Sequence, residues 1–312
     1  MAPQITELKK SIVQNFLLGD GTVRGKFSRM DSVVDDILRK HNYPDSVSQL
    51  LGETIIATVI LSSGLKFNGK FSLQVKGDGP LSTLLVDVTS GGDVRAYANF
   101  DKNSELIIRD QYEKQASFGQ LMGEGYIAFT VHQGPALDRY QGVVELRGNS
   151  ILESVQNYFS QSEQIDMTAK VIVRKVFGGG CDFEWRGGAI MLEKMPIDSS
   201  KAVKLDSEDL WTTSCIFLKT VTDEELLSVP SSKLQLIAHL FSTIGYNVIG
   251  QQFLISKCKC TREKSGSILA SFRDDEVSSI SENGIITMTC EFCETKYAFS
   301  EPEITNYKST HY

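Results

Sequence analysis

The chain has 312 residues, of which 41% are apolar, so it can bury a sizeable core in about two domains. Its formal net charge of −7 argues against a general nucleic-acid binder, which would present a basic face. No apolar signal core opens the sequence, and its longest apolar stretch, residues 54–61, is too short to span a bilayer. We therefore expect a cytoplasmic protein without a membrane partner, in which clustered cysteines are metal ligands or redox groups.

The first hundred residues predict a hairpin, two helices and an antiparallel meander. Asp20-Gly21 between two apolar runs is a hairpin signal. Apolar residues at helical spacing predict a helix over 30–39 and a second helix that Ser46 would cap. Glycine-rich turns then separate three further segments with alternating apolar residues. These predicted strands are 70–76, 81–88 and 94–100.

The middle of the chain predicts two strands on either side of a helix. We expect the strands at 126–132 and 168–174. Between them, Ser150 and Glu153 form a capping box at the start of a helix with an apolar stripe. The run Phe177-Gly178-Gly179-Gly180 then marks a flexible break, which we interpret as the first domain boundary.

Residues 190–245 differ in character and predict a string of short helices. Thr222 and Glu225 form another capping box, and Pro230-Ser231-Ser232 separates this helix from the next apolar stripe. None of these helices is long enough to be stable alone in water, so each needs a surface on which to pack.

Four of the six cysteines lie in the last fifth of the chain and predict a zinc site. Cys258 and Cys260 form a C-x-C motif, and Cys290 and Cys293 form a C-x-x-C motif. The intervening residues 261–289 are long enough for two short helices and a strand. Four thiolates would close the coordination sphere of Zn²⁺, as in structural rather than catalytic sites. The alternative is that the cysteines are buried without a metal, but packing alone rarely produces two close pairs.

The same four thiolates are targets for oxidants. Basic residues beside them in sequence could offset their charge and lower their pKa values. These residues are Lys257, Lys259, Arg262, Lys264 and Lys296. A C-x-x-C motif readily forms a disulfide, whereas a Cys258–Cys260 bond requires a backbone bend, since two extended residues span up to ~7 Å. Oxidation would release zinc and remove a folding contribution on the order of 10–16 kcal/mol. From spacing alone, a structural zinc and a redox switch both remain open.

Several segments of the chain resemble those of a known protein family. The segments around Cys258-Lys-Cys260 and Cys290-Glu-Phe-Cys293 are similar to the C-terminal zinc motif of the redox-regulated 33 kDa chaperonin family, heat shock protein 33. Residues 140–146, 158–164 and 187–196 look like its core and the entry into its linker, so the resemblance covers nearly the whole chain. It implies an α+β fold with an antiparallel-sheet core and helices, a helical linker and a small C-terminal zinc domain with four cysteine ligands. The predicted domains are a client-binding core at 1–177, the linker at 178–249 and the zinc-binding redox-switch domain at 250–312.

The resemblance also implies a function, that of an ATP-independent holdase rather than an enzyme. In such a family the reduced form with one bound Zn²⁺ is inactive. Oxidation would pair Cys258 with Cys260 and Cys290 with Cys293, zinc would leave, and the linker helices would separate from the core. Unfolding client proteins would then bind the exposed apolar surface, often with homodimerisation, during oxidative stress.

Two other functions are alternatives to that of a holdase. A structural zinc-ribbon protein that binds nucleic acid would explain the C-x-x-C motif and the nearby lysines, but the acidic net charge opposes it. An enzyme using a cleft in the core would need a nucleophile, acid or base that the sequence does not identify. Neither His132 nor His239 can be placed in such an arrangement, and His239 is expected to be packed or partly solvated on a helix.

A few remaining residues carry structural expectations. Cys181 and Cys215 match no part of the zinc motif. Cys215 lies in an apolar run and is expected to be buried, whereas Cys181 follows three glycines and is expected to be an exposed thiol that complicates a four-cysteine switch. Residues 162–164 are interpreted as a C-terminal helix turn, and residues 274–276 as the acidic first turn of a helix.

Overall fold

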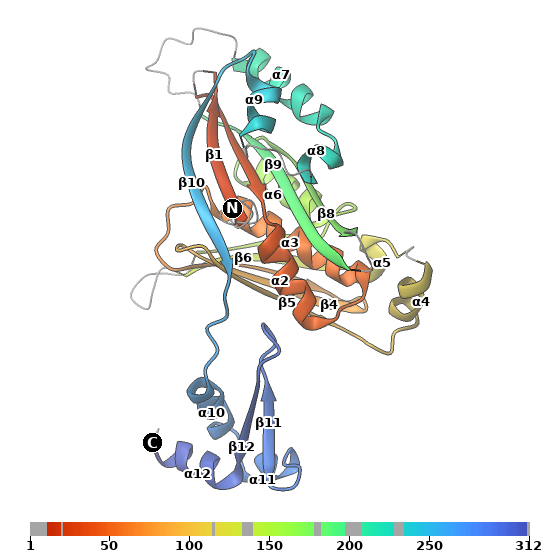
Figure 1. Ribbon diagram of the computed structural model, residues 1–312, viewed down its shortest axis with the longest axis vertical. Coiled ribbons are helices and arrows are strands. Elements are labelled where there is room, and N and C mark those ends of the chain that lie inside the picture. The colour runs from red at the N-terminus through yellow and green to blue at the C-terminus, as the bar shows by residue number, and fades with distance from the viewer. Residues whose placement is uncertain are drawn as a thin grey trace, which may run out of the picture. The chain divides into compact units, whose positions relative to one another are not determined.

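The computed structural model describes residues 11–19, 21–113, 116–132, 140–177, 182–196, 207–227 and 234–310 (Figure 1). The chain divides into two compact units, Met1–Ser256 and Lys257–Tyr312. Among the described residues, no helix is both long enough and apolar enough to cross a membrane.

A ten-stranded sheet forms the framework of the larger unit. Its strands are β1 (Ser11–Leu18), β2 (Val23–Arg29), β3 (Lys70–Gly77), β4 (Leu81–Thr89), β5 (Asp93–Phe100), β6 (Gly125–His132), β7 (Tyr140–Glu145), β8 (Met167–Phe177), β9 (Phe183–Lys194) and β10 (Tyr246–Ser256). They follow the order β7-β6-β3-β4-β5-β10-β1-β2-β9-β8. Neighbours are antiparallel except β5 and β10, which share only a short parallel register at Ile255 and Ser256. Two antiparallel half-sheets are therefore joined at this point.

Two helices, α2 (Asp31–His41) and α3 (Asp45–Ser62), pack against both half-sheets and form the main core with them. In α3, 13 of 18 residues are buried, so the helix is covered on nearly all sides. Its buried hydroxyls at Thr54 and Thr58 each donate to the carbonyl four residues earlier, at 2.6 Å, and are thereby satisfied inside the core. The other helices on this part of the unit are α4 (Glu105–Glu113), α5 (Phe118–Met122) and α6 (Ile151–Ser162).

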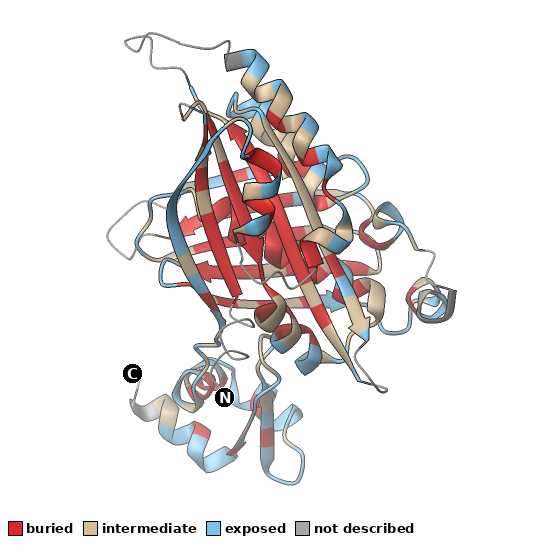
Figure 2. Ribbon diagram, turned by 45° about the horizontal axis from the view of Figure 1, so that its top comes forward, coloured by how far each residue is buried: buried red, intermediate tan, exposed pale blue. Residues whose placement is uncertain are grey.

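The half-sheet that contains β1, β2 and β9 is apolar on its second face as well. Helices α7 (Ser207–Thr220), α8 (Asp223–Leu227) and α9 (Gln235–Phe241) pack on that face (Figures 1 and 2). The buried apolar residues that meet there form one cluster, which we call the linker cluster. Its members are Phe16, Leu18, Val23, Phe27, Ile190, Leu192, Leu218, Val221, Leu226, Leu236, Ile237, Leu240 and Phe241. The short helices thus obtain from the sheet the packing surface that their length requires.

Most helices and strands that short sequence motifs predict are confirmed. The Asp20-Gly21 signal lies between β1 and β2, which pair antiparallel. The meander corresponds to β3, β4 and β5, and α6 begins after Ser150, whose side chain accepts from the Glu153 N–H. Ser46, however, does not cap α3. Pro44 occupies the N-cap, and the Ser46 hydroxyl lies one residue inside the helix, buried without a hydrogen-bond partner among the described residues.

The prediction that residues 178–249 form a helical linker is wrong at both ends. Strands β8 and β9 pair with Phe177 opposite Phe183, so residues 183–194 belong to the sheet rather than to a linker. The glycine run 178–180 lies outside the described residues. Residues 246–249 belong to β10, and the second compact unit begins at Lys257 rather than at 250. The physical reason is that β9 is buried on both faces and shows no alternation.

The smaller unit contains α10 (Arg262–Ala270), α11 (Asp274–Ser279), β11 (Ile285–Thr289), β12 (Lys296–Ser300) and α12 (Glu301–Thr310). The prediction of two short helices and a strand between the cysteine motifs is confirmed, and acidic residues open α11 as expected. Strands β11 and β12 pair as an antiparallel hairpin. The buried apolar core of this unit is small and consists of Leu269, Val277, Ile286, Phe299 and Ile304. A core of this size is near the limit below which a metal is usually needed for folding.

Candidate metal centre

Two backbone segments carry the four clustered cysteines. Cys258 and Cys260 lie between the end of β10 and the start of α10, whose N-cap Thr261 accepts from the Lys264 N–H at 3.2 Å. Cys290 and Cys293 lie in the turn that joins β11 to β12. In this turn the Cys293 N–H donates to the Cys290 carbonyl at 3.2 Å. This hydrogen bond closes the turn that carries the sulfur atoms of Cys290 and Cys293.

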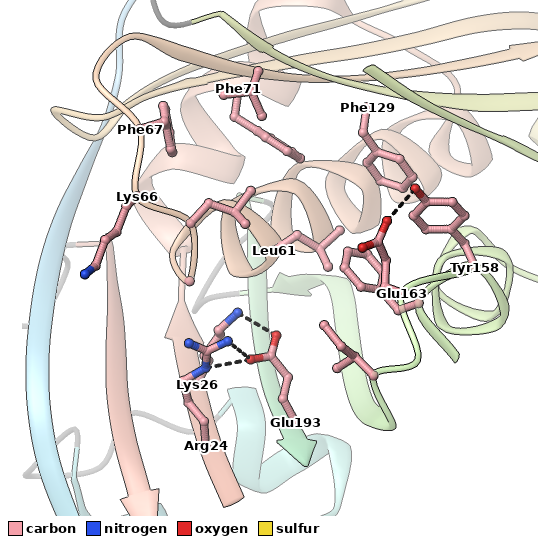
Figure 3. Close-up of a pocket in the computed structure, with 15 residues that line it drawn as sticks. Arg24, Lys26, Leu61, Lys66, Phe67, Phe71, Phe129, Tyr158, Glu163 and Glu193 are labelled. Carbon is pink, nitrogen blue, oxygen red and sulfur yellow. Dashed lines mark hydrogen bonds and ion pairs between the residues drawn. The ribbon is translucent and has the colours of Figure 1, made fainter. Parts of the chain in front are cut away.

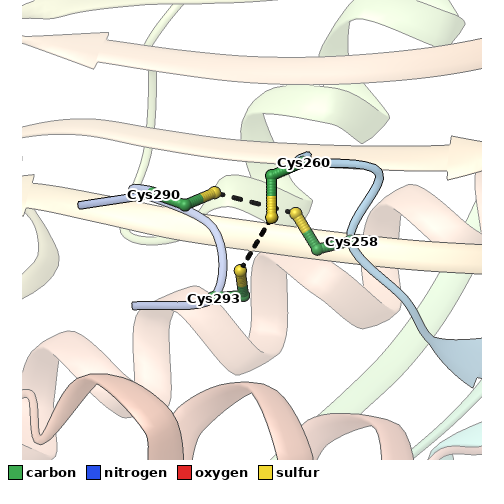
Figure 4. Close-up of side chains that lie close together, drawn as sticks. All are labelled: Cys258, Cys260, Cys290 and Cys293. Carbon is green, nitrogen blue, oxygen red and sulfur yellow. Dashed lines mark hydrogen bonds between the residues drawn. The ribbon is translucent and has the colours of Figure 1, made fainter. Parts of the chain in front are cut away.

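The four sulfur atoms face one another (Figure 4). All Sγ atoms lie within 4.8 Å of one another, with Cys258 and Cys290 at 3.7 Å and Cys260 and Cys293 at 3.4 Å. A tetrahedral Zn²⁺ with Zn–S bonds of ~2.3 Å would separate its ligands by ~3.8 Å. The donor set and its spacing fit one tetrahedral, thiolate-preferring ion, and four protein ligands would leave no open coordination position.

Neighbouring hydroxyl groups contact two of the sulfur atoms. The Tyr297 hydroxyl donates to Cys260 Sγ at 3.3 Å, and Thr295 Oγ1 lies 3.2 Å from Cys293 Sγ. Sequence reasoning assigned no role to either residue, although both lie within four residues of Cys293. Their position in β12 and its preceding turn directs them at the sulfurs, as outer-shell groups that orient metal ligands commonly do.

Without a metal, the thiols differ in acidity. Burial, assisted by Cys293 and Cys258, raises the pKa of Cys290 to about 12, and burial also raises the pKa of Cys260. Burial acts in the same direction on Cys293, but hydrogen bonds with Thr295 and the neighbouring sulfurs outweigh it and bring its pKa to about 7. At neutral pH, Cys260 and Cys290 therefore hold protons that a metal ion must displace.

Zinc affinity is expected to rise with pH. Because the pKa values of Cys260 and Cys290 are raised, binding at neutral pH releases about two protons from these two groups alone, so zinc affinity should rise by at least about 100-fold per pH unit. Competition with a chromophoric chelator, corrected for the chelator's own protonation, measures this slope. A pH-independent affinity between pH 6 and 8 would contradict the thiol assignment.

Charge near the site is arranged differently from the sequence-based expectation. Arg262, which was expected to offset the thiolates, forms an ion pair with Glu303 at 2.9 Å and lies over the Phe299 ring. Lys264 Nζ donates to the Lys259 carbonyl at 3.0 Å. The N-terminus of α10, two residues after Cys260, places the positive end of a helix dipole near the thiolates instead.

Comparisons with known proteins match nearly the whole chain. The family model described as "Hsp33 protein" matches residues 11–300. The chain belongs to the Hsp33 family. A 33 kDa chaperonin of Caulobacter vibrioides is 30% identical over 298 residues, covering 95% of this chain and 97% of that protein. One from Mannheimia succiniciproducens is 33% identical over 297 residues, covering 95% and 93%. The protein is accordingly a chaperone.

A solved structure shares the Hsp33 fold. The crystal structure of a 33 kDa chaperonin, an Hsp33 homologue from Thermotoga maritima, has a TM-score of 0.76 and 20% sequence identity, covering 97% of this chain and 99% of that chain. The predicted α+β class with an antiparallel-sheet core is thereby confirmed.

Other residues that the sequence analysis of this Hsp33 chain singled out belong to the larger unit. Cys215 lies on α7 and is half-buried rather than buried as expected, and burial raises its pKa. Cys181 lies outside the described residues. His239 is exposed on α9, so it is solvated rather than packed, and Glu163 is the C-cap of α6, as expected of a C-terminal helix turn.

Proposed function

We propose that the chain is a cytoplasmic, redox-regulated, ATP-independent chaperone that holds unfolding proteins, rather than an enzyme. The observation that carries this proposal is the convergence of the Cys258, Cys260, Cys290 and Cys293 sulfurs within 4.8 Å in a unit whose described apolar core has only five buried residues. A zinc ion bound by the four thiolates would supply the free energy that holds this unit folded. Oxidation of the same thiolates removes both the ligands and that free energy.

The oxidation step converts four thiolates into two disulfides. Two molecules of hydrogen peroxide accept the four electrons, take up four protons and leave as water, while Zn²⁺ is released. We propose the pairs Cys258–Cys260 and Cys290–Cys293, because closing a short loop costs less entropy than closing a long one once the metal has left. The Cys258–Cys260 bond would bend the backbone just after the last residue of β10.

The choice of pairs decides what oxidation does to the unit. The sulfurs of Cys258 and Cys290, and those of Cys260 and Cys293, are also in reach of each other, and these residues are 32 and 33 positions apart. Disulfides between the motifs would link the two halves of the unit and hold it together. Disulfides within the motifs leave the halves unlinked, so that loss of zinc unfolds the unit.

The linker cluster provides the surface that oxidation would expose. Strand β10 connects α9 directly to the cysteines and pairs with β1 beside this cluster. When the end of β10 loses its anchor, α7, α8 and α9 are proposed to separate from the sheet, because none is stable alone. The uncovered apolar face would bind unfolding client proteins and a second copy of the chain.

Polar contacts hold α8 in place before activation. Arg29 of β2 is buried and donates to the carbonyls of Leu226 at 2.7 Å and of Leu227, at the C-terminal end of α8. Lys170 and Arg174 of β8 form ion pairs with Asp223 at the other end of the helix. Such contacts hold the short helix on the sheet.

One experiment tests the proposed function. Reduced, zinc-loaded protein is treated with hydrogen peroxide, and zinc release, free thiols, disulfide connectivity by peptide mass spectrometry and suppression of aggregation of a heat-unfolded client are measured together. We expect zinc release, both within-motif disulfides and suppression of aggregation. Zinc release with unchanged client aggregation would refute redox activation, and disulfides between the motifs would refute the unfolding step.

A further inference from the structure

A pocket of about 540 Å³ lies in the larger unit (Figure 3). Its walls come from β2 and β9 of one half-sheet, from β3 and β6 of the other, and from the segments that follow α3 and end α6. Much of its lining is aromatic, including Phe67, Phe71, Phe129 and Phe159. Its volume and mainly apolar walls are those of a small-molecule site rather than of a packing defect.

One end of this pocket is charged. In the ladder between β2 and β9, Arg24 lies directly opposite Glu193, and Arg24 Nη2 is 2.6 Å from Glu193 Oε2. Lys26 Nζ is 2.8 Å from Glu193 Oε1, and its side chain is only 2% exposed. Two cationic side chains therefore share one carboxylate at the end of an apolar pocket.

The two cations have more hydrogen-bond donors than Glu193 can satisfy. A guanidinium carries five N–H donors and an ammonium three. In the described part of the chain, Glu193 is the only acceptor that contacts either Arg24 or Lys26. Burial is the largest influence on the pKa of Lys26 and lowers it, while Glu193 opposes this shift. A further acceptor in the pocket would satisfy donors that the fold leaves unused.

Space is kept open beside these donors. A Cβ atom at Gly64 would lie 2.6 Å from Lys26 Nζ, so the glycine leaves the head of the lysine uncovered. The opposite end of the pocket is different, since Tyr158 there donates to Glu163 at 2.8 Å (Figure 3). A ligand in the pocket would meet the hydrogen-bond donors of Arg24 and Lys26 at one end and the carboxylate of Glu163 at the other, with apolar walls between them.

We propose that this pocket binds a small amphiphile with a single anionic group, a medium-chain carboxylate, with its head on Arg24 and Lys26 and its chain against the aromatic walls. A charge-assisted hydrogen bond to a guanidinium fixes the head, and burial of the chain supplies the remaining affinity. Glu163 at the far end disfavours a second anionic group. None of the residues that line the pocket is a cysteine or a member of the linker cluster.

Calorimetric titration of the reduced, zinc-loaded protein with decanoate tests the proposal, with decanol and decyltrimethylammonium as uncharged and cationic probes. Decanoate should bind at least about tenfold more tightly than either, and Arg24→Gln should weaken decanoate binding about tenfold or more. The matched control is Arg186→Gln, which removes another arginine ion-paired to a β9 glutamate, with 27% exposure against 28% for Arg24. Its decanoate affinity should be unchanged.

A second variant tests the same site in case Arg24→Gln misfolds. Gly64→Ala retains every charge but crowds Lys26 Nζ, so it should also weaken decanoate binding while the melting temperature reports folding. Equal binding of decanol and decanoate, no binding of decanoate at all, or unchanged decanoate affinity in both variants would each overturn the proposal. None of these outcomes affects zinc release or client holding, which are measured separately.

Discussion

Replacing Cys290 with serine is expected to abolish zinc binding and to unfold Lys257–Tyr312, while the main core of the larger unit stays folded. A serine hydroxyl is a poor substitute for a thiolate, so zinc affinity should fall by more than the roughly 10–100-fold that loss of an outer-shell contact causes. The five-residue apolar core of this unit cannot replace the lost metal. Zinc analysis, together with amide hydrogen exchange resolved along the chain, measures both effects.

Cys215→Ser is the matched control for this variant. Cys215 is a half-buried cysteine of α7 that does not belong to the four-sulfur group. Its replacement should leave one zinc per chain and full exchange protection of α10 and β11. If Cys290→Ser retained zinc and the protection of the smaller unit, the cluster would not be what holds that unit folded.

Leu226→Ala is expected to give a protein that suppresses client aggregation without oxidation. Leu226 is fully buried in α8, within the linker cluster, and truncation of a buried leucine costs about 2–5 kcal/mol. A five-residue helix has no stability of its own to absorb this loss, so the linker helices should separate from β2 and β9 in a measurable fraction of molecules. Light scattering of a heat-unfolded client with reduced, zinc-loaded protein measures the effect.

Leu73→Ala separates this effect from general destabilisation. Leu73 of β3 is also fully buried, but it lies in the main core under α3 rather than in the linker cluster. It should lose a similar free energy of unfolding and remain inactive while reduced, at temperatures below its own unfolding. Equal activity of the two variants would mean that loss of stability, and not release of the linker helices, exposes the client surface.

Features encoded by neighbouring residues were predictable from sequence. The Asp20-Gly21 motif predicts a hairpin, and β1 and β2 on either side of it do pair antiparallel. The reciprocal bonds of Thr222 and Glu225 start α8, as their spacing predicts. The cysteine spacing alone indicated a shared site, because two close pairs in one small segment have few other uses. These are local patterns with a direct physical meaning.

Features that depend on the tertiary context were not predictable. β9 is covered on both faces, by the main core and by the linker helices, so its sequence lacks the alternation that marks a half-buried strand. Lys26 lies within a largely buried strand, and only its contact with Glu193 across the β2–β9 pair shows why a buried lysine is tolerated there. Tyr297 reaches Cys260 only because β12 folds back beside β11.

The place of β10 in the sheet has a consequence for synthesis of the chain. β10 is the last strand of the larger unit in sequence, yet it lies between β5 and β1, and Ser11 pairs with Leu254. During translation, one edge of β1 stays unpaired until β10 has been synthesised, when nearly the whole unit has left the ribosome. Pairing at such sequence separation is slow, and an open strand edge invites association with other chains. The nascent chaperone is therefore exposed, until β10 docks, to the same hazard from which it would protect its clients.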